Sequence, residues 1–60
     1  MMDLVRPTKT DVDVVIDDLR VSKQRVRVMF GETEEDRMLL AEVQEFLDAA
    51  IEDLQKVTTV

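Results

Sequence analysis

The chain has 60 residues, which allows one domain with a marginal core, because a domain of this size buries only about 60% of its unfolded surface. It contains no cysteine and no histidine, which excludes disulfides and zinc sites built from thiolate or imidazole. Its 14 acidic and 8 basic residues give a net charge of −6, which argues against general nucleic-acid binding, since neutralising phosphates requires excess lysine and arginine.

Residues 1–9 are predicted to form a loosely ordered N-terminal arm of a single domain that covers residues 1–60. Pro7 and its neighbours Thr8 and Lys9 interrupt any regular pattern there. The first residues lack the continuous apolar core of a signal peptide, and no apolar run approaches the roughly 20 residues that cross a membrane. We therefore expect a soluble, cytoplasmic protein with no membrane partner.

The first half of the chain is rich in valine, and β-branched residues favour strands over helices. Residues 25–30 alternate between basic and apolar side chains, which would place Val26, Val28 and Phe30 on one face of a strand. A similar alternation covers residues 11–17. The sequence therefore predicts a β-hairpin with strands at about these two positions.

A helical alternative for the same segment stays open. Residues 20–24, between the predicted strands, contain none of the Gly, Asn or Asp residues that favour a tight turn. In this alternative Thr10 and Asp13 cap a helix, the chain turns at Gly31, and two copies form a dimeric four-helix bundle. The apolar face of this helix would comprise Val12, Val15, Ile16, Leu19, Val26 and Phe30.

Residues 33–57 are predicted to form one long amphipathic helix. Gly31 ends the preceding element, Thr33 is the expected N-cap, and Asp36 completes a pair that resembles a capping box. Apolar residues then recur in steps of three and four, which places them on one face of the helix. The predicted core and dimer stripe comprises Leu39, Leu40, Val43, Phe46, Leu47, Ala50, Ile51 and Leu54.

The main fold prediction is an α+β protein in which the β-hairpin packs on the long helix, in the order ββα. The alternative is the all-α helical hairpin. The apolar arc of the C-terminal helix spans about 140° at ~100° per residue, which is wider than one hairpin covers. We therefore expect a homodimer.

Charge is segregated along the chain. The four basic residues of segment 20–30 occur without any acid, whereas both flanking segments are acidic. On the outer side of the second predicted strand, Arg25, Arg27 and Met29 form a candidate face for a protein partner. An alternative acidic face on the long helix comprises Glu42, Glu45, Asp48 and Glu52.

The sequence predicts no enzyme, cofactor or metal site, since no histidine can activate Ser22, the only serine. The predicted function is a small acidic module for protein–protein interaction or regulation, which binds another protein and forms a homodimer. The alternative is a nucleic-acid mimic that blocks a DNA- or RNA-binding protein, with carboxylates in place of phosphates. Direct binding of nucleic acid by this chain is not expected.

Overall fold

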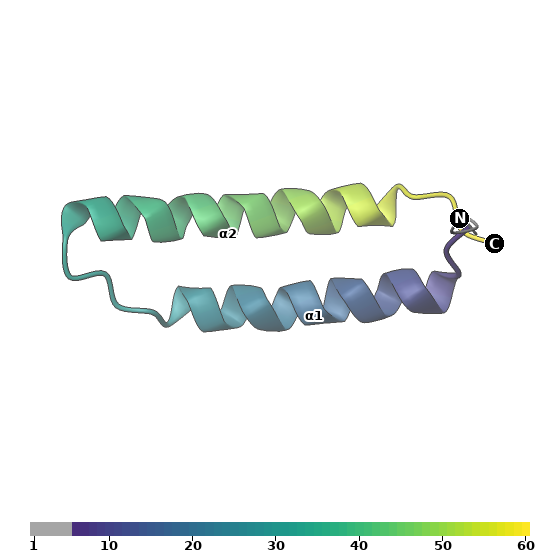
Figure 1. Ribbon diagram of the computed structural model, residues 1–60, viewed down its shortest axis with the longest axis horizontal. Helices are drawn as coiled ribbons and strands as arrows, with labels where there is room; N and C mark the ends of the chain where they lie inside the picture. Colours follow the sequence, from purple (N-terminus) through teal and green to yellow (C-terminus); the bar gives the residue numbers. More distant parts are fainter. Residues whose placement is uncertain (1–5) are drawn as a thin grey trace, which may run out of the picture.

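The computed structural model describes residues 6–60 as two antiparallel helices joined by a short connection (Figure 1). Helix α1 is Lys9–Arg27, and helix α2 is Glu34–Gln55. No residue in the range 6–60 belongs to a strand. Of the predicted N-terminal arm, residues 1–5 lie outside the described residues, and Lys9 already belongs to α1.

The ββα prediction is therefore wrong, and the all-helical hairpin is the fold. The predicted strand at 11–17 lies inside α1, and the one at 25–30 spans the end of α1 and the start of the connection. A β-branched residue costs a helix at most about 0.7 kcal/mol relative to alanine. That local preference is weaker than the packing of an apolar face with helical spacing, so the valine content of α1 does not determine its conformation.

Helix α1 begins with a complete capping box. The hydroxyl of Thr8 accepts a hydrogen bond from the backbone N–H of Asp11 at 3.1 Å, and the Asp11 carboxylate accepts one from the Thr8 N–H at 3.4 Å. The cap lies two residues before the predicted pair. Arg25 and Arg27 lie in the last turn, where cations interact favourably with the helix dipole.

Helix α2 begins as predicted, with Thr33 as its N-cap. The Thr33 hydroxyl accepts a hydrogen bond from the backbone N–H of Asp36 at 3.0 Å. The helix ends at Gln55 rather than at Val57, with Lys56 as the C-cap. Sequence capping signals therefore located the start of α2 more accurately than its end.

The connection between the helices depends on Gly31, whose backbone is buried. A Cβ atom at this position would lie 2.8 Å from Cγ of Arg37 and 2.9 Å from the Arg37 backbone nitrogen. The φ angle of Gly31 is not positive, so limited space, rather than backbone conformation, requires glycine here. The guanidinium of Arg37 also donates a hydrogen bond from Nη1 to the Gly31 carbonyl oxygen at 3.2 Å.

The hydrophobic core of the hairpin is small. Among the described residues, the only buried side chains are Val12 and Ile16, each 7% exposed. The radius of gyration is 14.8 Å, compared with about 10 Å for a compact domain of this length. A single hairpin thus leaves much of its apolar surface in contact with water.

Candidate interaction surface

The seam between the two helices is formed by residues at helical spacing on each of them. Those of α1 are Val12, Ile16, Leu19, Lys23 and Val26, all buried or half-buried. Those of α2 are Leu40, Gln44, Leu47, Ala50, Ile51 and Leu54, all half-buried. The seam therefore covers only one side of the broad apolar arc of α2.

A second apolar stripe runs along α2 beside the seam and has no cover. Leu39 is 51% exposed, Val43 41% and Phe46 73%. These residues follow one another in steps of four and three, so they share one face of the helix. Each of them immediately precedes a residue of the seam in the sequence. The uncovered stripe therefore adjoins the seam along the same edge of α2.

Helix α1 contributes to the same side of the hairpin. Val15 and Ser22 are exposed, and each also immediately precedes a seam residue, as do the charged residues Asp11, Asp18 and Arg25. The helices are antiparallel, so the residue that directly precedes a seam residue points toward the same side of the hairpin on both helices. We call this side the open face; it comprises Val15, Ser22, Met29, Leu39, Val43 and Phe46.

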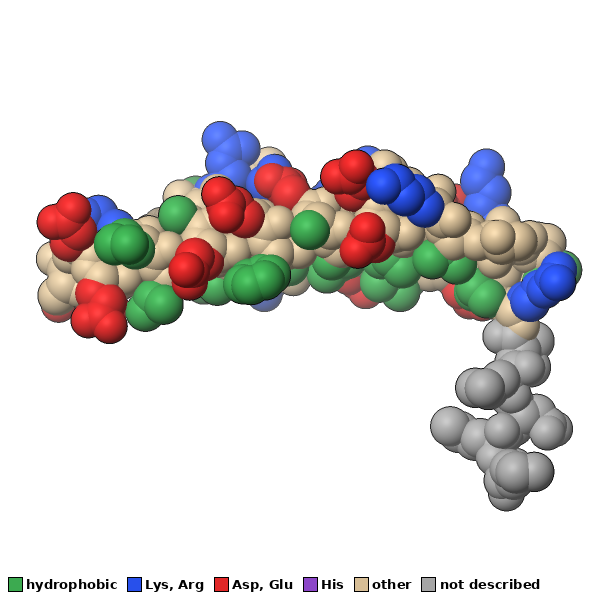
Figure 2. Space-filling view, turned by 90° about the horizontal axis from the view of Figure 1, so that it is seen from above, with side chains coloured by type: hydrophobic (Ala, Val, Ile, Leu, Met, Phe, Trp, Pro, Cys, Tyr) green, Lys and Arg blue, Asp and Glu red, His purple; other side chains and the backbone are tan. Residues whose placement is uncertain are grey.

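The space-filling view agrees with this arrangement, because hydrophobic side chains line one long edge of the molecule over most of its length (Figure 2). Acidic side chains dominate the surface of α2 that faces the viewer there. The hairpin is therefore amphipathic as a whole, with an apolar side that its own residues do not cover.

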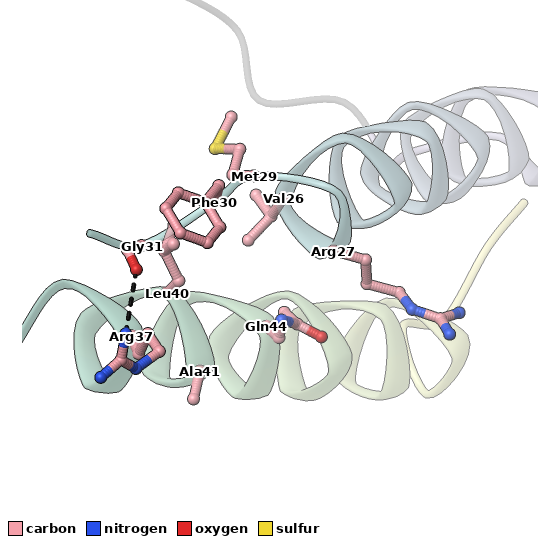
Figure 3. A pocket seen from close by; sticks show the side chains of 9 residues that line it. All are labelled: Val26, Arg27, Met29, Phe30, Gly31, Arg37, Leu40, Ala41 and Gln44. Atoms are coloured by element: carbon pink, nitrogen blue, oxygen red, sulfur yellow. Dashed lines mark hydrogen bonds between the residues drawn. The ribbon is translucent and has the colours of Figure 1, made fainter. Parts of the chain in front are cut away.

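At the turn end, the open face meets two shallow pockets. One, of about 430 Å³, is lined by Met29 and Phe30 of the connection and by Asp36, Leu39 and Leu40 of α2. The other, of about 250 Å³, lies between the end of α1 and the first turns of α2, where Arg37 bonds to the Gly31 carbonyl (Figure 3). Met29 and Leu39 line the same pocket, which places the connection and α2 on a shared apolar surface.

The side of the hairpin opposite the open face is polar. Lys23 Nζ lies 2.5 Å from Oδ1 of Asp48, which joins α1 to α2 by an ion pair. Within α2 and its C-cap, Lys56 Nζ lies 3.6 Å from Oε1 of Glu52, one helical turn away. Exposed pairs of this kind contribute at most modestly to stability. Their main effect here is to occupy two of the carboxylates of the acidic face.

The structure does not bring the three residues of the candidate partner face together. Arg25 and Arg27 are both exposed on α1, but they point to nearly opposite sides of the helix, because two residues correspond to a rotation of about 200°. Met29 lies in the connection and belongs to the open face. The grouping depended on a strand, in which alternate residues share a face.

The predicted stripe and the alternative acidic face both lie on α2. The stripe divides into the covered side chains of the seam and the uncovered ones of the open face. All four members of the acidic face, Glu42, Glu45, Asp48 and Glu52, are exposed. Val15 and Ser22 were missed as surface residues; the signal that could have found them is their position directly before a seam residue.

Comparison with protein-family models, with curated proteins and with solved structures found no match for this chain. Within residues 6–60, neither helix is long and apolar enough to pass through a membrane. The same residues contain no group of acidic side chains placed to hold a metal ion.

Proposed function

We propose that this chain is a small acidic, non-enzymatic interaction module that works as a homodimer of helical hairpins. The observation that carries the proposal is the open face, which gathers exposed apolar side chains of α2 with Val15 and Met29 on one side of a hairpin that buries only two of its described side chains. Exposed apolar patches that exceed a few hundred Å² often mark protein–protein interaction sites. A four-helix bundle is the common way in which two helical hairpins cover such faces.

The exposed area is of the size that a dimer needs. The accessible surface of the hairpin is 5337 Å², whereas a compact monomer of 6.9 kDa exposes about 4,000 Å². One partner in a standard protein–protein interface buries about 800 Å². A second copy can therefore bury such an area within the excess. The second copy presents the same open face, so in a two-fold dimer the open faces of the two subunits would pack against each other.

Dimerisation would leave the polar side of each hairpin available to another protein. That side carries the acids Asp48 and Glu52 of α2 and the basic Lys23 of α1. A regulatory or adaptor role in the cytoplasm forms part of this proposal. Nucleic-acid mimicry has less support, because Asp48 and Glu52 are each paired with a lysine and only Glu42 and Glu45 of the acidic face are unpaired within residues 6–60.

Two matched variants test the proposal by sedimentation equilibrium. Phe46 lies on the open face and is 73% exposed, and Met38 lies outside it and is 65% exposed. A monomeric hairpin should therefore tolerate a substitution by glutamate about equally well at either position. We expect Phe46→Glu to raise the dimer dissociation constant at least ~100-fold, because burial of a phenylalanine contributes roughly 1.5–3 kcal/mol in each subunit. Met38→Glu should leave the constant nearly unchanged. A wild-type chain that is monomeric at high micromolar concentration and unfolds cooperatively would contradict the proposal.

A further inference from the structure

We propose that the two-fold axis of the homodimer runs perpendicular to the helices, so that α1 packs antiparallel to α1 of the second copy and α2 antiparallel to α2. This inference rests on the proposed homodimer and adds its geometry. Two-fold axes in another direction are equally compatible with an apolar face. The charges and the residue pattern of the open face favour this one.

The charges along α1 favour the perpendicular axis. Asp18 lies one turn after Val15, and Arg25 one turn after Ser22, so both charges border the open face. Among the described residues, neither has an ion-pair partner. The two residues are equally distant from a point between Val21 and Ser22. Antiparallel pairing of α1 about that point places Asp18 opposite Arg25 of the second copy, and two-fold symmetry creates the pair twice.

The apolar residues of α2 favour the same axis, because their order is nearly symmetric about a point between Phe46 and Leu47. Val43 and Ala50 are equally distant from that point, and so are Leu39 and Leu54. Antiparallel pairing of α2 about it therefore places each exposed apolar side chain of the open face at the level of a half-buried apolar side chain at the edge of the seam. Valine faces alanine across the axis, which allows side chains of different sizes to interdigitate.

The two centres lie at the same height in the hairpin. Lys23 pairs with Asp48, and Val26 lines a pocket with Leu40. Since both helices rise equally per residue, these contacts place residues 21–22 of α1 level with about residues 45–49 of α2. The centre of the α2 pattern falls within that range. A single axis therefore serves both helices.

The competing arrangement has its two-fold axis parallel to the helices and packs α1 against α2 of the second copy. It would lay Asp18, in the acidic first half of α1, along the second half of α2, where Asp53 directly precedes the seam residue Leu54 and borders the open face. The proposed arrangement brings Glu42 near Asp53 of the second copy instead. That pair lies at the solvated rim, where salt screens like charges.

Cysteine cross-linking distinguishes these arrangements directly, because the natural chain contains no cysteine. Ser22 lies at the proposed axis, so Ser22→Cys should form a disulfide-linked dimer under mild oxidation. Gln24→Cys, at a similar height on α1 but away from the open face, is the matched control and should remain unlinked. Glu32→Cys, in the connection, should also remain unlinked, because antiparallel packing places the two turns at opposite ends of the dimer.

Charge reversal gives a second, non-covalent readout. Asp18→Arg and Arg25→Asp should each raise the dimer dissociation constant about tenfold, because two exposed pairs become repulsive at once. The double variant should restore dimerisation. Asp13→Arg, which makes the same charge change on the polar side of α1, is the control and should have little effect.

The outcomes separate the two proposals. A wild-type chain without dimers contradicts the proposed function. A wild-type dimer in which Ser22→Cys fails to cross-link, or in which the double charge reversal fails to restore association, overturns the perpendicular axis alone. Cross-linking through Glu32→Cys would indicate the parallel axis. Ser22 is exposed in the hairpin. The helical circular dichroism of the reduced variants should match that of the wild type, which tests that each change leaves the fold intact.

Discussion

Replacing Gly31 by alanine should destabilise the protein by about 1–3 kcal/mol. The added Cβ would lie 2.8 Å from Cγ of Arg37 and 2.9 Å from its backbone nitrogen, so the start of α2 must move away from the connection. Overpacking of this kind typically costs 1–3 kcal/mol. The movement also weakens the hydrogen bond from Arg37 to the Gly31 carbonyl, which contributes about 0.5–1.5 kcal/mol. The lower entropy of the unfolded alanine chain offsets about 0.4–1 kcal/mol.

Urea denaturation followed by circular dichroism, at one fixed protein concentration, measures this effect. Arg37→Ala and the double variant complete a thermodynamic cycle. Removal of the arginine side chain should relieve only part of the cost of Gly31→Ala, because the backbone nitrogen of Arg37 remains in the way. A Gly31→Ala protein at least as stable as the wild type would refute the close approach, since the cost of overpacking would then be no larger than the stabilising entropy term.

Two further changes test the helices themselves by the same unfolding measurement. Ile16→Ala should cost about 2–5 kcal/mol, and Ile16→Val only about 0.5–1.5 kcal/mol, because Ile16 is one of the two buried side chains of the described hairpin; equal losses for both would contradict its place in the core. Thr8→Ala should cost about 1 kcal/mol by removing the capping hydroxyl of α1, whereas Thr10→Ala, inside the first turn, should cost much less; similar losses at the two threonines would argue against the cap at Thr8.

The long C-terminal helix was predictable because its signals agree with one another. Thr33 and Asp36 mark its start, and the apolar residues that follow keep one helical spacing. The first helix was predicted incorrectly because its signals conflict. Valine content favours a strand, whereas the lack of turn-forming residues at 20–24 favours a continuous helix. The observed helix agrees with the second signal, because residues 20–24 lack the residue types that favour the tight turn of a β-hairpin.

The open face was only partly predictable for a related reason. The sequence shows which residues of α2 are apolar, but the position of α1 determines which of them stay uncovered. Arg25 and Arg27 illustrate the same dependence, because they share a face in a strand and diverge in a helix. Once α1 is known to be helical, Val15 and Ser22 follow from the seam residues Ile16 and Lys23 beside them.

The hydrogen bond between Pro7 and Val60 holds both ends of the described chain at one end of the hairpin, opposite the connection (Figure 1). Any sequence attached to either end would therefore leave the hairpin from the same place. The hairpin is 45 Å long, so a dimer with the proposed perpendicular axis would direct two such attachments to opposite ends of one rod. A short helical pair of this kind could set a fixed spacing between the proteins joined to it.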